Sequence, residues 1–398
     1  MSVPIVRVGD IAEQIRGVTY AKGDAVDAPT PGHIPLLRAG NISDNGLDFN
    51  GLIFVSARRV SPKQLIRSGD VVIAASSGSL DIVGKAGQAA SDFPGGFGAF
   101  CKVLRPRDMV DARYFGHYFR TSSYRKEIST LAAGANINNL RSDHLDGLQI
   151  PLPALEVQRR IAQTLDSVDA LRTKRRDAIT LLDDLRQAIF LDMFGNPVSN
   201  PEGWPMVRLA ELGSLDRGVS KHRPRNAPEL LGGKYPLVQT GDVAASQGYI
   251  TKWKATYSDI GLTQSKLWPS GTLCITIAAN IAKSGILEFD ACFPDSIVGF
   301  SSTPDIVEYV QVWLSFHREN LERLAPESAQ KNINLGVLRG LDIPKPDSGL
   351  ISSFAERIRA INTIKVALRF HLTELDALFV SLQHRAFRGE LWADSTAA

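Results

Sequence analysis

IPLPALEVQRRIAQTLDSVDALRTKRRDAITLLDDLRQAIFLDMFG (150–195) predicts one long helix that follows a rigid proline step. Pro151 and Pro153 cannot continue a helix from upstream, so they fix where it starts. Apolar residues then recur at alternating steps of four and three, which is the heptad pattern of a helix that packs lengthwise against another helix. This apolar seam consists of Ile161, Leu165, Val168, Ile179, Leu182, Ile189 and Met193.

A second copy of this stretch lies near the C-terminus, where IPKP (343–346) precedes another heptad seam. The two seams align at an offset of 193 residues, which relates Ile161 to Phe354 and places Arg172 opposite Lys365 as a shared polar interruption. Each seam needs a partner to shield it from water, and the other copy is the obvious one. The second seam consists of Phe354, Ile358, Ile361, Leu368, Leu372, Leu375, Phe379, Leu382 and Ala386.

The rest of the chain is duplicated as well. PIVRVGDI (4–11) returns as PMVRLAEL (205–212), and IPLLRAGNI (34–42) returns as YPLVQTGDV (235–243), both at an offset of 201 residues. Such self-similarity indicates a tandem duplication in which each unit is a globular domain followed by a long helix. The predicted segments are a first domain at 1–150, a first helix at 151–195, a second domain at 196–343, and a second helix with the C-terminal tail at 344–398.

The globular domains are expected to mix strands and helices, since short β-branched runs are bounded by Gly, Pro, Asp or Ser. One helix is expected at 111–130 and one at 304–325. The glycine-rich FPGGFGAF (93–100) precedes a strand-like run where a nucleotide-binding loop should follow a strand, so we interpret it as a hairpin turn. The expected fold class is therefore α+β, with two mixed α/β domains separated by two long helices. The predicted strands are VVIAAS (71–76), GAFCKVL (98–104), TLCITIA (272–278) and SIVGFSS (296–302).

Composition limits the class of protein. A chain of 398 residues with 44% hydrophobic and 22% charged residues is typical of a soluble protein with two or more domains. No apolar run approaches the roughly 18 residues of a membrane span, and no secretory leader is recognisable, so we expect a cytoplasmic protein without a membrane partner. The three cysteines are too far apart for a disulfide or zinc framework. The net charge of +3 means that nucleic-acid binding would depend on local basic patches.

Motifs with catalytic or metal-binding spacing do not occur in the sequence. It contains neither the GxxxxGK[ST] motif for ATP nor the NPP[YF] motif of adenine amino-methyltransferases, and the seven histidines are scattered. The pair Asp183-Asp184 falls on a face of the first long helix, where a solvated surface is a better interpretation than acid–base chemistry. We therefore expect no catalytic residues, no metal ligands and no cofactor in this chain.

Polar, basic and glycine-rich loops recur at equivalent places in both domains. Arg, Lys, Asn, Gln and Ser are the side chains that bind base edges and phosphates, and glycine lets the backbone approach a duplex closely. Each loop alone is also compatible with a solvated surface, and Trp253 could pack on its own domain, but the recurrence favours DNA binding. The candidate DNA-binding residues are Lys22, Arg38, Asn41, Ser77, Ser79, Lys85, Asn136 and Asn138 in the first domain, and Lys221, Arg223, Arg225, Gln239, Lys252, Lys254, Asn280, Lys283, Lys331 and Asn332 in the second.

This arrangement resembles the specificity subunit of type I restriction-modification systems over almost the whole chain. The resemblance implies two target-recognition domains that each read half of a split double-stranded DNA sequence. It also implies that the two helices pair as an antiparallel coiled coil, with an internal pseudo-two-fold repeat. The second helix departs from the family pattern, because SGLISSFAERI (348–358) lacks the E-x-Q start. The motifs that carry the resemblance are the proline step, the E-x-Q-x-x-I-A start (Glu156, Gln158, Ile161, Ala162) and the F-x-G end (Phe387, Arg388, Gly389).

The resemblance further implies partner proteins. Two methyltransferase subunits and restriction motor subunits would dock on the helices, and those partners would use S-adenosylmethionine, ATP and magnesium. On this interpretation the chain is a non-catalytic, sequence-specific DNA-binding subunit. The alternatives are a stand-alone bipartite DNA-binding regulator that recruits no enzyme, and a protein-scaffolding adaptor whose loops bind proteins. Co-purification with methyltransferase subunits would exclude the regulator, and indifference to duplex DNA would exclude the family interpretation.

Overall fold

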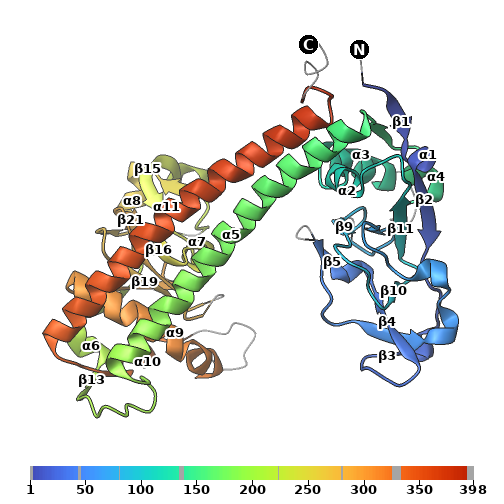
Figure 1. The fold of residues 1–398 in the computed structure, drawn as a ribbon. Coiled ribbons are helices and arrows are strands. Elements are labelled where there is room, and N and C mark those ends of the chain that lie inside the picture. The colour runs from blue at the N-terminus through green and yellow to red at the C-terminus, as the bar shows by residue number, and fades with distance from the viewer. Residues whose placement is uncertain are drawn as a thin grey trace. The chain divides into compact units, whose positions relative to one another are not determined.

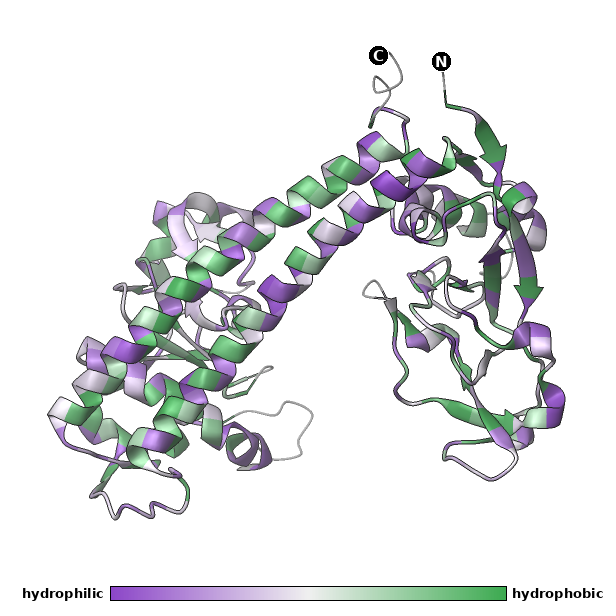
Figure 2. Ribbon diagram, in the orientation of Figure 1, coloured by the Kyte–Doolittle hydropathy of each residue, from purple (hydrophilic) through white to green (hydrophobic). Residues whose placement is uncertain are grey.

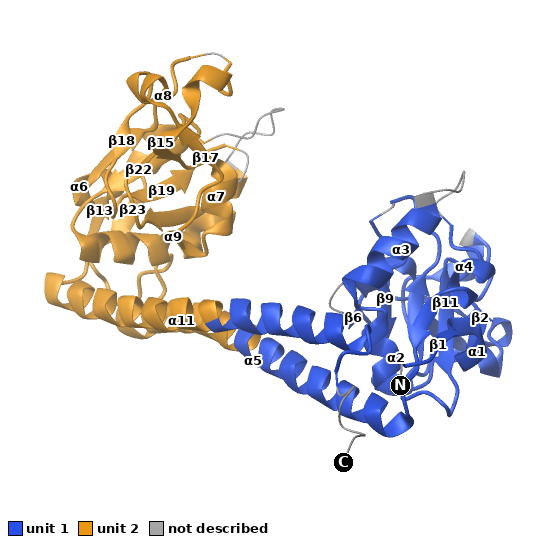
Figure 3. Cartoon of the chain, turned by 90° about the horizontal axis from the view of Figure 1, so that it is seen from above, with its two compact units in different colours: residues 1–175, 371–398 blue, residues 176–370 orange. Residues whose placement is uncertain are grey.

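The chain folds into two compact units, each with one globular α/β domain (Figure 1). The computed structural model describes residues 3–43, 46–79, 81–133, 139–222, 224–278, 281–324 and 333–391. Unit 1 comprises residues 1–175 and 371–398, and unit 2 comprises residues 176–370 (Figure 3). Each unit therefore contains part of both long helices, which are α5 (Leu155–Phe194) and α11 (Ser348–Ala386).

The domain of unit 1 contains twelve named strands within its described residues. They are β1 (Ile5–Arg7), β2 (Ala12–Arg16), β3 (Ala25–Val26), β4 (His33–Leu37), β5 (Ile42–Ser43), β6 (Gly46–Leu47), β7 (Ile53–Ser56), β8 (Val71–Ala74), β9 (Ala86–Gln88), β10 (Gly96–Phe97), β11 (Cys101–Pro106) and β12 (Gln149–Pro151). The α-helices are α1 (Val8–Ile11), α2 (Ala112–Tyr118), α3 (Ser122–Ala133) and α4 (Ser142–Asp146).

Two four-stranded sheets form the body of this domain. One has the order β2-β11-β8-β9 and is antiparallel throughout. The other has the order β10-β4-β7-β3, in which β10 and β4 run parallel. Strand β8 is buried at every position because it lies inside the first sheet and both of its faces are covered.

The domain of unit 2 repeats this design with an added strand. One sheet has the order β14-β22-β19-β20-β16, and the other has the order β17-β15-β21-β18. The strands are β13 (Met206–Arg208), β14 (Ser214–Arg217), β15 (Leu231–Leu237), β16 (Gly248–Ile250), β17 (Ala255–Tyr257), β18 (Leu267–Trp268), β19 (Leu273–Thr276), β20 (Ser284–Leu287), β21 (Ala291–Cys292), β22 (Ile297–Ser301) and β23 (Asp342–Pro344). The helices are α6 (Leu209–Leu212), α7 (Thr240–Ala245), α8 (Asp259–Thr263), α9 (Pro304–Leu324) and α10 (Leu335–Arg339).

Most of the local predictions are confirmed, and two are wrong. All four predicted strand runs contain a strand, and the helix expected at 304–325 is α9. The single helix expected at 111–130 is instead α2 and α3. The break occurs because the Thr121 hydroxyl donates to the carbonyl of Tyr118 (2.7 Å) and accepts from the amide of Tyr124 (3.2 Å), which closes one helix and caps the next.

The FPGGFGAF segment (93–100) is not the simple hairpin turn that the sequence suggested. It contains β10, which pairs in parallel with β4, where Gly96 lies opposite Leu36. The chain then enters β11 in the other sheet. The segment therefore crosses between the two sheets, and its glycines fit this close approach: a Cβ on Gly95 would lie 2.4 Å from the Pro35 carbonyl oxygen.

In each domain the first strand is hydrogen-bonded to the proline step. β1 pairs antiparallel with β12, and β13 pairs antiparallel with β23. A buried tyrosine in each domain donates a hydrogen bond to the proline step. Tyr114 Oη donates to the Pro151 carbonyl (2.7 Å), and Tyr309 Oη donates to the Pro344 carbonyl (2.8 Å). We call these two hydrogen bonds the tyrosine locks. In each domain, two segments that are far apart in the sequence are thus paired in one small sheet, which fixes where the long helix leaves that domain.

Both long helices begin just after the proline step and end just before a glycine in the left-handed region. Gly195 has φ +72° and Gly389 has φ +71°, a conformation that favours glycine and stops a helix. Between these ends, apolar and polar residues alternate along α5 and α11 (Figure 2). The end of each helix contacts a tyrosine lock, since the ring of Phe387 lies 5.0 Å from that of Tyr114 in unit 1, and the ring of Phe194 lies 5.1 Å from that of Tyr309 in unit 2.

The polar interruptions of the two seams form equivalent ion pairs. In unit 1, Arg172 Nε lies 2.6 Å from Asp376 Oδ1, and its Nη1 lies 2.7 Å from Asp169 Oδ1. In unit 2, the buried Lys365 ammonium binds Asp183. The offset of 193 relates Arg172 to Lys365 and also Asp183 to Asp376. Interpreting Asp183 as merely solvated surface was therefore wrong, because its carboxylate neutralises a buried cation.

These ion pairs generate a stability prediction. Asp183→Ala should destabilise the full chain by about 3 to 5 kcal/mol, because it leaves the buried Lys365 without a counter-charge. Asp376→Ala should cost only about 1 kcal/mol or less, because Arg172 is more exposed and keeps Asp169. Thermal and denaturant unfolding measure both effects. The double variant Asp183→Ala with Lys365→Met should recover most of the loss; a double variant as unstable as Asp183→Ala would contradict this account.

Candidate nucleic-acid interface

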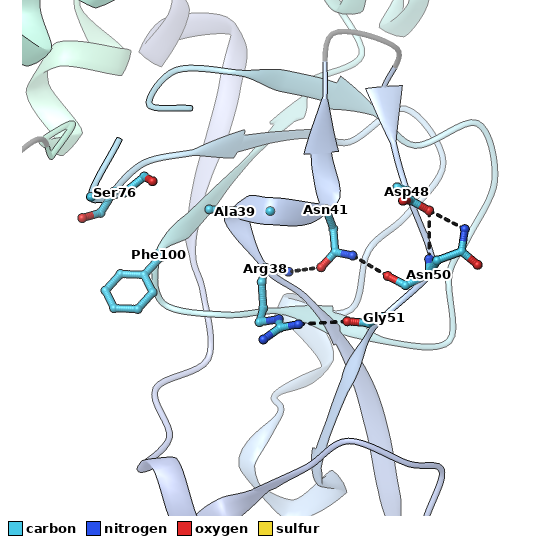
Figure 4. Close-up of a pocket in the computed structure, with 11 residues that line it drawn as sticks. Arg38, Ala39, Asn41, Asp48, Asn50, Gly51, Ser76 and Phe100 are labelled. Carbon is cyan, nitrogen blue, oxygen red and sulfur yellow. Dashed lines mark hydrogen bonds between the residues drawn. The ribbon is translucent and has the colours of Figure 1, made fainter. Parts of the chain in front are cut away.

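A pocket of about 790 Å³ opens in the domain of unit 1 (Figure 4). Its walls come from the turn after β4, the loop that precedes β7, the loop after β8 and the residue before β11. Three predicted DNA-binding residues line it together, namely Arg38, Asn41 and Ser77. The antiparallel strands supply the scaffold, and the polar residues lie where strands end and the backbone turns.

Asn41 holds the pocket wall in place. Its Oδ1 accepts from the Arg38 amide (2.9 Å), and its Nδ2 donates to the Asn50 carbonyl (2.8 Å). The side chain is buried, and both ends of its amide are thereby engaged. A DNA-reading role for Asn41 stays a prediction, whereas the geometry gives it a direct part in shaping the turn.

Arg38 and Phe100 give this pocket its chemistry. Arg38 Nη2 donates to the Gly51 carbonyl (3.0 Å), which orients the guanidinium at the edge of the pocket (Figure 4). Phe100 directly precedes β11, and its side chain is 66% exposed. A forked donor beside an exposed aromatic ring can bind an anion or a base edge and stack on a planar ring.

The domain of unit 2 has a smaller pocket, of about 290 Å³, that includes the matching turn after β15. The offset of 201 relates Arg38 to Gln239, and Gln239 lines this second pocket with Arg225 and Ser296. The turn is conserved in form, because Asp242 Oδ2 accepts from the Gln239 amide (2.9 Å) as Asn41 does for Arg38.

The equivalence of the two pockets extends to their opposite wall. Phe100 accepts through its carbonyl from the Ala75 amide (2.8 Å), and Ser296 does the same from the Ile277 amide (3.0 Å). Phe100 and Ser296 thus occupy matching positions on the two scaffolds. The two pockets therefore share a framework but differ in lining, with Arg38 and Phe100 in one and Gln239 and Ser296 in the other.

Two further predicted residues occupy matching positions at the base of a loop. Lys85 accepts through its carbonyl from the Ala74 amide (2.9 Å) where the β8–β9 loop closes, and Lys283 does so from the Thr276 amide (2.9 Å) where the β19–β20 loop closes. Both lysines are partly exposed. Each loop thus carries a lysine at the same structural place in both domains.

The remaining predicted residues are distributed over exposed turns. Ser79 donates through its amide to Ser77 Oγ (3.2 Å), and Lys221 donates through its amide to the Gln264 carbonyl (3.3 Å). Lys252 and Lys254 are exposed on the β16–β17 loop. Trp253 between them packs on its own domain, 4.5 Å from the ring of Phe289.

Arg225 has a carboxylate partner within its own domain, and several other predicted residues lie outside the described part. Arg225 forms an ion pair with Asp295 on the surface of unit 2. The structure does not test DNA contact for any of these residues, so their roles stay predictions. The residues outside the described ranges are Asn136, Asn138, Arg223, Asn280, Lys331 and Asn332, and the side chain of Lys22 is also outside them.

Sequence reasoning missed Phe100 and Ser296. A signal was available for Phe100, because a large aromatic residue at the end of a glycine-rich crossing segment has no obvious core to enter. No comparable signal existed for Ser296, whose position depends on the register of β22 with β19.

Metal ligands and cysteine thiols can be assessed among the described residues. None of them forms a group of three or more His, Cys, Asp or Glu side chains that could hold a metal ion. Cys101, Cys274 and Cys292 are free and buried, and burial raises the pKa of each thiol, to about 12 for Cys101. Such thiols are poor nucleophiles at neutral pH. Within the same ranges, no helix has the length and apolar character needed to cross a membrane.

Comparison with known proteins identifies the family. The family described as "Type I restriction modification DNA specificity domain" matches residues 3–181 and 201–360. The chain is 28% identical to the EcoKI specificity subunit of Escherichia coli K12, over 98% of this chain and 89% of that protein. It is also 28% identical to the StySPI specificity subunit of Salmonella potsdam, over 97% of this chain and 88% of that protein.

Solved structures agree at the level of the fold. A crystal structure of a type I restriction-modification S subunit from M. genitalium superposes with a TM-score of 0.60 at 14% identity, covering 96% of both chains. A chain from a study of the assembly of a type I R-M system superposes with a TM-score of 0.55 at 17% identity, covering 98% of both chains. With two family matches that follow the two repeats of the sequence, this chain belongs to the family of type I restriction-modification DNA specificity proteins.

Proposed function

We propose that this chain is the non-catalytic DNA-recognition subunit of a type I restriction-modification enzyme, and that each globular domain reads one half of a bipartite duplex sequence. The observation that carries the proposal is a pocket in each domain that includes the matching turn and the matching position before a central strand, with different side chains at both. The names of the EcoKI and StySPI relatives, which are specificity subunits of restriction enzymes, support the same function.

The linings suggest what each domain reads. Arg38 offers the two parallel donors that match guanine O6 and N7, whereas Gln239 offers the donor and acceptor that match adenine N7 and N6. Phe100 adds an exposed ring for stacking, and Ser296 at the equivalent position in the second domain does not. The two half-sites would therefore differ at the base pair that faces these positions.

The two long helices, in this proposal, pair as an antiparallel coiled coil that spaces the two domains. Contacts within each unit support this. In unit 2, Asp183 contacts Lys365, and further along α5 the ring of Phe190 lies 5.6 Å from that of Phe354, earlier on α11. In unit 1, Arg172 on α5 contacts Asp376 on α11. Residue numbers that rise on one helix while they fall on the other are the pattern of an antiparallel pair.

Exposed apolar residues on the helices support the docking of partner proteins. Leu171 and Leu378 in unit 1, and Leu185 and Ile364 in unit 2, are between 43% and 51% exposed. The offset of 193 relates Leu171 to Ile364 and Leu185 to Leu378, so the two exposed pairs are equivalent. We name Leu171 with Leu378 the first leucine pair, and Leu185 with Ile364 the second leucine pair. Equivalent patches would bind two copies of one partner, which we propose is the methyltransferase subunit.

The chemistry would then belong to the partners. Methyltransferase subunits would supply S-adenosylmethionine-dependent methylation, and restriction motor subunits would use ATP and magnesium, all in the cytoplasm. A stand-alone DNA-binding regulator or a protein-scaffolding adaptor remains the alternative. Pull-down of methyltransferase subunits by the full chain would exclude the regulator, and specific binding of that assembly to duplex DNA would exclude the adaptor.

Base reading can be tested at Arg38 and Gln239. Arg38→Ala should weaken binding of the assembled enzyme by about 1 to 3 kcal/mol and relax the preference at one base pair of one half-site. Gln239→Ala should do the same in the other half-site. Binding to a panel of duplexes with single substitutions measures both effects. Lys126→Ala, an exposed cation on α3 away from the pocket, is the control. If both pocket variants keep the base preferences of wild type, Arg38 and Gln239 do not read bases.

Docking can be tested by stoichiometry. The double variant Leu171→Glu with Leu378→Glu should reduce the number of bound methyltransferase subunits from two to one. The substitutions place charge in one apolar contact and leave the second leucine pair intact. Adding Leu185→Glu and Ile364→Glu should abolish assembly. Native mass spectrometry counts the subunits, and Thr173→Glu, which adds the same charge at an exposed neighbour, should retain both. Two subunits on the first double variant would show that the partner docks elsewhere.

A further inference from the structure

A second hollow, of about 370 Å³, lies next to the first pocket in the domain of unit 1. The two share a wall: Phe100 lines the first pocket, and its neighbours Ala99 and Cys101 line the second. Ser76 of the first pocket also forms a β-bridge with Asn139 of the second. Three cations line this second hollow, namely Arg16, Lys102 and Arg141.

Two of these cations face each other across the sheet. Arg16 on β2 lies directly opposite Lys102 on β11. Side chains of directly opposite residues stand on the same face of the sheet, with Cβ atoms roughly 4.5–5.5 Å apart, and like charges at such a pair are destabilising. The register of β2 with β11 therefore places a repulsive pair in the lining of this hollow.

Nothing in the described part of the chain neutralises this pair directly. Within those residues, no carboxylate lies within 4 Å of the Arg16 guanidinium or the Lys102 ammonium. Lys102 Nζ donates to the neutral Ser142 Oγ (3.2 Å), and Arg141 keeps its own surface ion pair with Asp143 (3.0 Å). Asp146 is the other carboxylate that affects the pKa of Lys102, and its Oδ1 accepts a hydrogen bond from Gln14 Nε2 (2.8 Å).

The balance of these charges acts on Lys102 itself. Burial lowers the pKa of Lys102, the Arg16 guanidinium lowers it further, and Asp146 and Asp143 act in the opposite direction. Burial is the largest of these causes, so the lowered pKa mainly reflects the loss of water around the ammonium group. An anion bound beside Lys102 and Arg16 would favour the charged form of Lys102.

The fold does not require this repulsion. In the domain of unit 2 the matching residue of β14 is Arg217, and it lies opposite Val298 on β22. The same scaffold therefore accepts an apolar residue at the position of Lys102. The second cation is therefore specific to the first domain and is not needed to form the sheet.

We propose that this second hollow binds a backbone phosphate of duplex DNA, and that Arg16 and Lys102 are positioning residues for the base-reading pocket beside it. The inference rests on the proposed function. A phosphate between the two cations converts their repulsion into attraction for both. A phosphate contact next to a base contact fixes the register of the duplex without reading its sequence. The first domain would thus hold DNA by one site and read it by the other.

The test combines DNA binding with stability. Wild type, Lys102→Met and Arg16→Gln are compared as full chains in complex with methyltransferase subunits, using a target duplex and a scrambled duplex across roughly 50 to 200 mM salt. The slope of log K against log salt is negative, and loss of one phosphate contact should reduce its magnitude by about 0.9. Binding to both duplexes should weaken alike, by about tenfold at low salt. Lys126→Ala should leave the slope unchanged.

The melting temperature of the free full chain supplies a readout of opposite sign. Lys102→Met should melt at the same temperature as wild type or higher, because it removes a repulsive neighbour. Arg217→Gln, which faces no second cation, should not raise it. Inorganic phosphate distinguishes the source of the ligand: stabilisation of wild type but not of Lys102→Met would mean that the hollow accepts free phosphate too, and no effect would assign it to the duplex backbone.

Each outcome decides the matter. An unchanged salt slope in both variants would overturn the inference, and so would a lowered melting temperature in Lys102→Met with unchanged binding, since both outcomes would make the pair purely structural. A changed slope with retained base preference supports it. If the wild-type complex does not bind duplex DNA at all, the proposed function fails first, and the inference falls with it.

Discussion

An apolar seam some 40 residues long cannot remain in water, and this constraint organises the whole chain. α5 and α11 each carry such a seam, and both cross from one compact unit to the other. Within unit 2, Phe190 and Phe354 of the two helices are buried together, and within unit 1, Val168 and Phe379 share one core with the globular domain. The helices are thus part of the hydrophobic core of each unit.

The tyrosine locks explain how a domain is held to its helix. Tyr114 hydrogen-bonds the carbonyl of Pro151 and also contacts the ring of Phe387. One side chain therefore joins the start of one long helix to the end of the other, and Tyr309 repeats this with Pro344 and Phe194. Such an attachment sets the direction of the helix from within the domain core, so surface loops can vary without disturbing it.

The two pockets show how the same framework accommodates different recognition. The turn that Asn41 builds in one domain is built by Asp242 in the other, so the backbone is the same. Exposed lining positions differ between the two pockets, and Arg38 in one corresponds to Gln239 in the other. The cation Lys102 is a similar difference between the two domains. It lies where the second domain has Val298, and the strands keep the same register.

The duplication, the two long helices and the four strands β8, β11, β19 and β22 could be predicted from the sequence, because heptad spacing, proline steps and short β-branched runs are local signals. The sequence also brought Arg38 and Gln239 into the candidate site through their repeat positions. Three features are visible only in the folded chain: Thr121 divides a helix, Asp183 neutralises a buried lysine, and Arg16 lies opposite Lys102. Strand register and helix pairing arise from contacts between distant segments, and no local pattern encodes which distant residue will lie opposite.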